Sequence, residues 1–419
     1  MRFVLGYYRE SREIEIPDQN IGKVLEPRKP EAGGKGESGR NETELVEAAL
    51  DSASELLKET IRPGEKVVII TSDITRPMPS YKVLPSLIRR LGNNGISDSD
   101  IRIVLALGNH RKHTREEMEA IVGSEIFARI ECIDSDHKNI VRLGTTRRGT
   151  PVDIFRPVVE ADKRICLGNV EYHYFAGYSG GMKAIMPGVS TAEAIQANHS
   201  HMVEANAYAG RIEVNPVRED IDEVYSLCPA DFIVNVVLDE KKKIVRAFAG
   251  DAFAAHRDGC AFLDTLYKCS IGEPADIVIV TPGGFPKDLN LYQAQKALDN
   301  AKHAVKEGGI IILLAACPEG FGESVFERWM TTSSSPDQMV EAIRVRFELG
   351  GHKAAAIGMV QQKADIFLVS EFSPDLVKRI FMTPFADIQG AFEEAFARKG
   401  EEASVHIMPF GGSTLPVLS

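Results

Sequence analysis

Residues 66–77 read KVVIITSDITRP, so that a short apolar run leads directly into a polar loop. An apolar run of this length, rich in β-branched residues, is typical of a strand that is buried on both faces. The pattern recurs and predicts eight strands: Lys66–Ile70, Arg102–Leu107, Arg164–Leu167, Phe232–Val237, Asp276–Val280, Ile310–Leu314, Asp365–Val369 and Ser404–Met408. Amphipathic stretches predict helices at Thr43–Thr60, Ser80–Asn93, Thr191–Glu204, Ala252–Tyr267, Leu291–Val305, Pro336–Leu349 and Phe385–Lys399. Strands that alternate with helices indicate βαβ units and parallel sheets covered by helices.

The chain has 419 residues, which is too long for one ordinary domain. We expect an α/β fold with two domains, each built on a largely parallel or mixed sheet flanked by helices. The segment Cys269–Pro274 separates a helical pattern from the next strand, so it predicts a hinge between residues 1–270 and residues 271–419. Pro27–Arg40 is rich in Pro, Gly, Lys and Glu, and it is expected to be a loop rather than a domain boundary.

Composition and charge exclude several classes of protein. The formal charge is −11, from 49 basic and 60 acidic residues, which argues against a protein that binds nucleic acid or an anionic membrane. An acidic protein that handles an anionic substrate needs a local cluster of Arg, Lys or His. No apolar run reaches the ~20 residues of a membrane span, and Met1–Gly6 does not resemble a secretory signal. The six cysteines form no Cys-x-x-Cys pair, so we expect free thiols in the cytoplasm.

Ligands of open α/β sheets bind beyond the carboxyl ends of the strands, so the loops that follow strands are candidate sites. In Thr71–Pro77, the side chains of Asp73, Thr75 and Arg76 could hold a ribose hydroxyl and an anion; the alternative is a helix cap. In Gly108–Thr114, His110 is well placed for proton transfer; the alternative is a structural histidine.

Two further features of Gly108–Thr114 have simpler interpretations. Thr114 and Glu117 form a capping box, so His113 is expected only to lead into a helix. His110 and His113 are spaced as metal ligands could be, but no carboxylate accompanies them in the sequence.

The third loop, Gly168–Lys183, is the densest in polar and glycine residues. Glycines at 177, 180 and 181 are expected to turn backbone N–H groups toward an anion, and Lys183 adds a positive charge. Ala184 follows the lysine, so the segment is not a nucleoside-triphosphate P-loop. The alternative is a glycine turn with surface histidines.

Two helices carry the remaining candidates. Ser190 and Glu193 predict a capping box for a helix with His199 and His201, of which only one can face the site. In the fourth loop, Gly283–Lys296, Asn290 is a candidate cap for a helix on which Gln293 and Lys296 are neighbours able to grip a carboxylate; the alternative is a solvated helix face.

Taken together, these segments resemble the nickel-dependent lactate racemase family. The resemblance extends over most of the chain, and its most specific parts are Asp73–Pro77, Gly108–Arg111, the run from Glu171 through His173 and Gly177–Gly181 to Lys183, Asn198–His199, and Pro286–Lys296. It implies that the first domain binds the cofactor, that the second contributes substrate contacts, and that the active site lies in the interdomain cleft.

The resemblance also implies a cofactor and a role for each candidate residue. The cofactor is the nickel-pincer nucleotide, a pyridinium-3-thioamide-5-thiocarboxylic acid mononucleotide with Ni²⁺, tethered covalently to Lys183. His199 completes a square-planar nickel site, a geometry that nickel(II) favours. Asp73, Thr75 and Arg76 line the cofactor pocket, and Arg76 also faces the substrate carboxylate. His110 and His173 are the two acid/base residues, while Tyr292, Gln293 and Lys296 approach the substrate from the second domain.

The implied reaction inverts the C2 centre of a small 2-hydroxy acid by reversible hydride transfer. Removal of the C2 hydrogen as a proton is opposed by the neighbouring carboxylate, whereas its removal as hydride needs an electron-poor acceptor. Proteins that make the cofactor are implied partners. The alternatives are a 2-hydroxy acid dehydrogenase, against which no G-x-G-x-x-G follows a strand, and a non-catalytic carrier of the nucleotide.

The identity of the substrate is left open between lactate and a larger 2-hydroxy acid. Lys112 stands where members of the family often have proline. Trp329, the single tryptophan, does not align with the aromatic residue that shapes the lactate pocket, and it is expected to be a core or interface anchor.

Overall fold

The computed structural model describes residues 1–28, 40–239 and 241–418. The chain forms two compact units, one of Met1–Lys29 with Thr265–Ser419 and the other of Pro30–Asp264. These compact units differ from the predicted division at residues 270 and 271 in two respects, because the chain crosses between units near residue 264 and also near residue 29. The second crossing falls in Pro27–Arg40, which was expected not to be a boundary; residues 29–39 of that segment lie outside the described residues.

The unit Pro30–Asp264 contains a six-stranded sheet in the order β13-β12-β9-β4-β5-β6. Neighbouring strands are parallel except for β13, which pairs antiparallel with β12 at one edge. The strands are β4 (Val67–Ser72), β5 (Ile101–Ala106), β6 (Glu131–Asp134), β9 (Lys163–Asn169), β12 (Phe232–Leu238) and β13 (Ile244–Gly250). The four strands predicted in this part of the chain are confirmed, and the antiparallel edge makes the sheet mixed.

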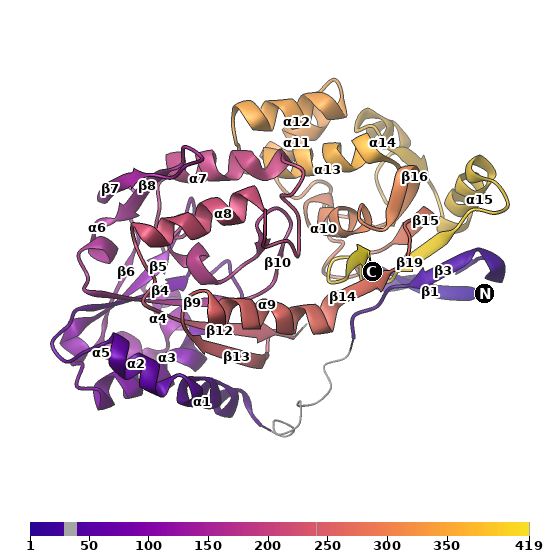
Figure 1. Cartoon of the computed structure of the whole chain (residues 1–419). Helices are drawn as coiled ribbons and strands as arrows, with labels where there is room; N and C mark the ends of the chain where they lie inside the picture. Colours follow the sequence, from indigo (N-terminus) through magenta and orange to yellow (C-terminus); the bar gives the residue numbers. More distant parts are fainter. Residues whose placement is uncertain (29–39, 240, 419) are drawn as a thin grey trace. The chain divides into compact units, whose positions relative to one another are not determined.

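Five helices cover one face of this sheet: α1 (Glu42–Ser52), α2 (Ser54–Thr60), α3 (Ser80–Asn93), α4 (Arg115–Val122) and α5 (Ser124–Arg129). Their apolar side chains form one core with those of Ile69, Ile103 and Val234 from the strands. Figure 1 shows α1, α2 and α3 on one side of the strands, and α7 (Ala192–Ser200) and α8 (Pro216–Glu223) on the other. The single helix predicted at Thr43–Thr60 is interrupted at Ala53, which closes α1.

Shorter elements complete this unit. The strands β7 (Ile140–Thr145) and β8 (Pro151–Phe155) form an antiparallel pair that leads into α6 (Arg156–Val159). The two-residue strands β10 (Tyr172–His173) and β11 (Gly177–Tyr178) form a small hairpin after β9. The helix α9 (Ala254–Tyr267) ends the unit, two residues shorter at its start than predicted.

The other unit has a six-stranded, entirely parallel sheet in the order β18-β17-β16-β15-β19-β3. Its strands are β3 (Ile21–Val24), β15 (Ala275–Val280), β16 (Val305–Leu314), β17 (Ala364–Val369), β18 (Thr383–Phe385) and β19 (Val405–Met408). The four strands predicted in this half are confirmed. A separate parallel pair joins β14 (Lys268–Ile271) to β20 (Leu415–Leu418), so that Cys269 lies in a strand rather than in the predicted hinge.

Alternate residues of the parallel strands face two different cores. Val278, Ile311 and Leu368 contribute to a core that also contains side chains of α10 (Leu291–Ala301), α11 (Ser324–Thr332), α12 (Pro336–Val345), α13 (Gly351–Lys363) and α14 (Pro374–Arg379). The opposite face packs with α15 (Ile388–Lys399) and with the hairpin of β1 (Arg2–Tyr7) and β2 (Glu10–Glu15). Leu5 of this hairpin is buried, which explains why the amino terminus belongs with the C-terminal half.

All six cysteines are free, as predicted. Burial raises the pKa of the Cys132 and Cys228 thiols to about 11, so both are protonated at neutral pH. Among the residues that the structure describes, each helix is too short or too polar to cross a membrane.

The packing of the hairpin yields a stability prediction. Leu5→Ala should lower the free energy of unfolding of its unit by about 2–5 kcal/mol, because it opens a cavity against the sheet. Urea unfolding followed by hydrogen exchange measures the loss, which should appear in β15 and β16 and not in β4 and β5. Val4→Ala is the matched control, since Val4 is 61% exposed on the same strand. Loss of protection in β4 instead would assign the hairpin to the other unit.

Candidate functional site

Three of the four predicted loops meet at one edge of the mixed sheet. They follow β4, β5 and β9, and β4 pairs in parallel with both of the other strands. Because parallel neighbours end at the same edge, the loops after them are brought together. This placement, together with the contacts below, gathers Asp73, Thr75, Arg76, His110, His173, Lys183 and His199 in one region.

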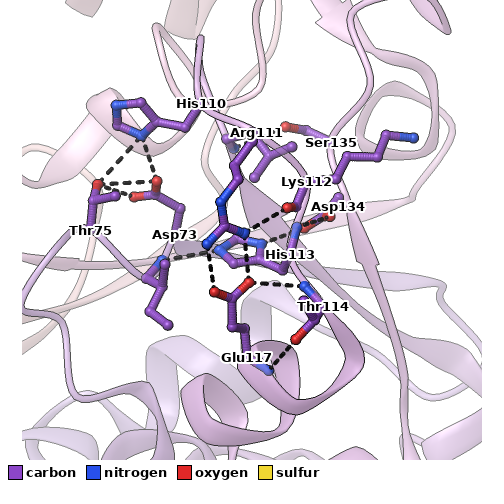
Figure 2. A network of polar contacts seen from close by, with 12 residues as sticks. Asp73, Thr75, His110, Arg111, Lys112, His113, Thr114, Glu117, Asp134 and Ser135 are labelled. Carbon is purple, nitrogen blue, oxygen red and sulfur yellow. Dashed lines mark hydrogen bonds and ion pairs between the residues drawn. The ribbon is translucent and has the colours of Figure 1, made fainter.

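The loops after β4 and β5 are joined by a histidine–carboxylate pair (Figure 2). Nδ1 of His110 lies 2.5 Å from Oδ2 of Asp73, and the Thr75 hydroxyl donates to Asp73 at 2.9 Å. Burial alone raises the pKa of Asp73, but the hydrogen bond and charge of His110, with Thr75 and Arg76, lower it below its ordinary value. The ionised carboxylate can only accept, so Nδ1 of His110 carries the hydrogen and Nε2 carries the lone pair when the ring is neutral.

The structure gives His113 a different role from the one predicted. Its ring is buried, with Nδ1 2.6 Å from Oδ1 of Asp134, at the end of β6, and with Nε2 accepting from the Ile74 backbone N–H at 3.1 Å. The capping box of Thr114 and Glu117 is confirmed, but His113 does more than lead into the helix. A carboxylate also accompanies each histidine of this loop, contrary to expectation, because Asp73 and Asp134 come from other strands.

The glycines of the third loop allow close packing rather than an anion cradle. Gly177 has φ +76°, and a Cβ there would lie 1.9 Å from the Arg211 carbonyl oxygen; a Cβ at Gly181 would meet the His256 ring. The expectation that these backbone N–H groups face an anion is not met at Gly181, whose N–H donates to Oδ1 of Asn235. The loop is therefore packed closely against neighbouring parts of the chain.

Three residues that support this loop were missed by the sequence analysis. Arg218 of α8 is completely buried and donates to the carbonyl oxygens of Ala176 and Tyr178. His256 of α9 donates from Nε2 to the Ser179 carbonyl oxygen at 2.8 Å, and Asn235 of β12 binds Gly181. They are distant in sequence from the loop, and no local pattern marks them; an arginine between the apolar residues Val217 and Ile221 is the nearest to a signal.

His173 lies on β10 and is surrounded by cationic side chains. Burial, then the charges of Lys183, His199, Arg76 and Arg218, hold its pKa well below the usual range, so the ring is neutral. Nδ1 of His173 accepts the Ala176 backbone N–H at 3.2 Å. The neutral ring therefore carries its hydrogen on Nε2, which is the opposite arrangement to that of His110.

Lys183 follows the hairpin, in a 3₁₀ turn at Gly181–Ala184. Burial, then the positive charges of Arg218 and Arg76, keep its pKa well below the ordinary value, while Glu171 acts in the opposite direction. An uncharged amine is nucleophilic, unlike an ammonium group. The buried arginine thus supports the loop and also favours the reactive form of Lys183.

His199 lies on α7, with only 7% of its surface exposed. The helix is capped by Thr191, whose side chain accepts from Ala194 N–H; the predicted cap Ser190 donates instead to the Ile185 carbonyl oxygen. Nδ1 of His199 bonds to the Ile195 carbonyl oxygen at 2.8 Å. A carbonyl only accepts, so Nδ1 carries the hydrogen and Nε2 the lone pair, and burial, followed by the charge of Lys183, lowers the pKa to about 3.

Phe175 places His199 next to the hairpin. Its ring makes edge contacts with His173, at 4.4 Å between centroids, and with His199, at 4.9 Å. His201 is in the turn after α7 and bonds to Glu204, so only one histidine of this helix belongs to the cluster, as predicted.

These residues fit the implied cofactor. A neutral imidazole whose other nitrogen donates to a carbonyl is a typical metal ligand, and an uncharged lysine can form a covalent bond. Among the described residues, no group of three or more His, Cys, Asp and Glu side chains could hold a metal ion. A metal held by His199 together with atoms of a bound organic group is consistent with that finding. Arg76, Lys183 and Arg218 supply the local basic cluster expected in an acidic chain.

Comparisons with known proteins identify the family. The model of the lactate racemase N-terminal domain matches residues 7–210, and that of the lactate racemase C-terminal domain matches residues 271–415. The chain belongs to the lactate racemase family. As a member of this family it is an isomerase of the racemase type, so the dehydrogenase and carrier alternatives are set aside.

Individual members of the lactate racemase family match the chain over nearly its full length. Lactate racemase of Thermoanaerobacterium thermosaccharolyticum is 32% identical over 423 residues, covering 98% of both chains, and that of Lactiplantibacillus plantarum is 34% identical over 419 residues, covering 97% of both. The solved apoprotein from Thermoanaerobacterium thermosaccharolyticum has 31% identity and a TM-score of 0.86, with both chains covered completely. A protein from Thermotoga maritima, at 18% identity and a TM-score of 0.59 over 90% of this chain and 98% of that one, shows the fold alone.

The fourth loop lies in the other unit, where α10 carries the remaining candidates. Asn290 caps this helix as predicted, and Gln293 and Lys296 are exposed. Tyr292 is half-buried, and Nζ of Lys353 from α13 donates to its carbonyl oxygen at 2.6 Å and lies 4.0 Å from its ring centroid. Burial, then the charge of Lys296, lowers the pKa of Lys353 to about 7. The sequence analysis missed Lys353, since a buried lysine on a helix has no local signature.

Trp329 is a packing residue, as expected. It lies on α11 and packs against the core, and its indole N–H donates to Glu348 at 2.6 Å. A Cβ on Gly351 would collide with its ring, so the tryptophan fixes the start of α13.

The buried histidines of this site make stability depend on pH. His256 has a folded-state pKa well below 6.5, so below that value the unfolded state binds more protons and unfolding becomes easier. The free energy of unfolding of the apoprotein is measured by urea titration at several pH values between about 8 and 5. It should fall as the pH falls, and His256→Gln should make that fall less steep by up to about 1.4 kcal/mol per pH unit. His137→Gln, at an exposed position, should leave the slope unchanged. If the free energy of unfolding depends on pH in the same way in wild type and His256→Gln, this assignment is contradicted.

Proposed function

We propose that this racemase inverts the C2 centre of a 2-hydroxy acid by reversible hydride transfer, with His110 and His173 as acid/base residues. The observation that carries the proposal is the Asp73–His110 pair, which joins two loops at the same sheet edge as His173, Lys183 and His199. Proton transfer beside an anchored electron acceptor requires this combination of groups.

Lys183 and His199 are the residues that would hold a nickel-pincer nucleotide, the first by a covalent bond and the second as ligand to Ni²⁺. When bound, this group would supply an electron-poor acceptor for the C2 hydrogen with its electron pair. Asp73 and Thr75 would line its pocket. The neutral states of Lys183 and His199 support these assignments, because a protonated nitrogen can neither form the tether nor bind the metal.

The chain's own residues would bind the substrate and move its proton. Arg76 would hold the carboxylate through its planar fork of donors. Nε2 of His110 would accept the hydroxyl proton, and Asp73 would stabilise the resulting imidazolium by its charge. Tyr292, Gln293 and Lys296 of α10 would contribute further contacts to the substrate.

His173 would serve the opposite enantiomer, and the two histidines are not equivalent. In the neutral ring Nε2 of His173 is a hydrogen-bond donor, because Nδ1 accepts from Ala176 N–H. For His173 to act as a base at Nε2, its proton must leave or move to Nδ1, which breaks that contact. Burial of the ring and the positive charges of Arg76 and Arg218 favour loss of the proton from a charged His173 to a substrate oxygen.

We propose lactate or a larger 2-hydroxy acid as substrate, with nickel as the metal and cofactor-biosynthesis proteins as partners in the cytoplasm. The curated relatives named lactate racemase support the smaller substrate. The larger substrate stays a candidate because Lys112 departs from the proline that the family resemblance implies at this position. Its side chain is largely exposed and pairs with Asp136 at 3.5 Å.

Deuterium labelling tests the proposed reaction. Enzyme loaded with nickel and cofactor is given a panel of 2-hydroxy acids in D₂O, and each product is analysed by chiral chromatography and mass spectrometry. We expect inversion of at least one acid, with the original hydrogen largely retained at C2, because a hydride is returned directly. Quantitative deuterium at C2 of the inverted product would overturn hydride transfer, and absence of inversion across the panel would overturn the substrate class.

Substitutions at the histidine–carboxylate pair test the assignment of the bases. His110→Ala and His173→Ala should each abolish inversion, while Asp73→Asn should lower kcat by about 10²–10⁴-fold, because it removes the charge that stabilises protonated His110. Chiral chromatography of loaded enzyme measures the rates. Asp136→Asn is the control, since the Asp136 carboxylate pairs with the exposed Lys112 side chain and accepts the Lys138 backbone N–H, and neither contact involves His110 or His173. Normal kcat in any of the first three variants would refute the two-base scheme.

A further inference from the structure

We infer that His113 is a positioning residue for this reaction: as a neutral hydrogen-bond bridge to Asp134, it fixes the peptide that carries Asp73 and thereby orients His110. The inference rests on the proposed function for the roles of Asp73 and His110. It concerns a histidine that neither the cofactor nor the acid/base scheme uses.

The bridge connects the ends of three adjacent strands. Asp134 ends β6, His113 lies in the loop after β5, and Ile74 lies in the loop after β4. His113 is fixed to Asp134 twice, through Nδ1 at 2.6 Å and through its own backbone N–H at 2.8 Å. The side chains of His113 and Asp134 are only 1% and 5% exposed, so β6 provides a rigid anchor.

The peptide between Asp73 and Ile74 is held at both of its polar groups. Its N–H donates to Nε2 of His113 at 3.1 Å, and its carbonyl oxygen accepts the Arg76 backbone N–H at 3.1 Å. Because a peptide is planar, fixing both groups fixes the plane and the Cα of Asp73 within it, which narrows the directions that the Asp73 side chain can take. The Asp73 carboxylate is the partner of His110, so the orientation passes to the proposed base.

Both hydrogen bonds of the His113 ring require one protonation state. The carboxylate of Asp134 needs a hydrogen on Nδ1, whereas the Ile74 N–H needs a lone pair on Nε2. Only the neutral ring with its hydrogen on Nδ1 satisfies both partners. In a protonated ring, Nε2 of His113 would carry a hydrogen that points at the Ile74 backbone N–H. Nε2 of His113 is thus occupied by the Ile74 N–H, and the His113–Asp134 pair has a structural role. In the His110–Asp73 pair, by contrast, the lone pair on Nε2 of His110 is available for proton transfer.

Histidine-selective ¹⁵N NMR tests the positioning role without relying on turnover. Full-length protein is measured as wild type, His113→Leu, His113→Gln and Lys112→Ala. In the wild type, we expect both His110 and His113 to show a protonated Nδ1 and an unprotonated Nε2. His113→Leu removes both ring contacts, so the His110 signals should move toward a mixture of tautomers. His113→Gln, which offers one donor and one acceptor, should restore most of the wild-type pattern, and Lys112→Ala should not change it.

The rate of inversion by loaded enzyme provides the second readout. His113→Leu should lower kcat/KM by about 10–100-fold, the usual effect of removing a residue that orients a reacting group. The loss should shrink when Asp73→Asn is already present, because the bridge acts through Asp73. His113→Gln should retain activity within about fivefold of wild type.

Two results would overturn the inference: unchanged His110 signals in His113→Leu, or full additivity of His113→Leu with Asp73→Asn. If His113→Leu does not fold, the comparison of His113→Gln with Asp134→Asn decides, since only the latter removes the charged anchor and should disturb His110. If the enzyme inverts no 2-hydroxy acid, the proposed function fails while the NMR result still decides whether His113 orients His110.

Discussion

The parallel pairing of β9, β4, β5 and β6 is the constraint on which the rest of the site depends. It places four strand ends side by side, so that residues from different loops, such as Ile74 and His113, share hydrogen bonds. The strands themselves are apolar and specify only the sheet. Chemistry enters where each strand stops, because the backbone there is no longer paired and polar side chains can face each other.

Burial determines the chemical state of the groups that gather at this edge. The chain is acidic as a whole, but Arg76 and Arg218 concentrate positive charge around His173. An anionic ligand would offset this charge. Desolvation and the neighbouring positive charges favour the uncharged forms of Lys183, His173 and His199. One set of side chains can thus attract an anion and also keep its nucleophile and its metal ligand deprotonated.

Much of this arrangement was predictable from sequence because it depends on local patterns. The apolar run before Asp73 predicts a strand, which is found, and the polar residues after it lie at the strand end, where Asp73 contacts His110. A local sequence pattern does not show which residues from neighbouring strands and loops will contact a given side chain. His113 reads locally as the residue before a capping box, yet Asp134 and Ile74, from two other strands, make it a bridge. Arg218 and His256 support the glycine loop from distant helices for the same reason.

The domain boundary was missed for a related physical reason. Residues before the Pro27–Arg40 segment were assigned to the unit that follows them, since neighbours in sequence are usually neighbours in space. However, β3 completes the parallel sheet beside β19, and Leu5 and Ile14 cover its other face. The edge strand and an apolar face of the C-terminal unit therefore come from the start of the chain, and that sheet would expose both without them. The unpaired backbone groups of a sheet edge and an exposed apolar face both favour being covered by another segment. The sequence does not show which distant segment will cover them.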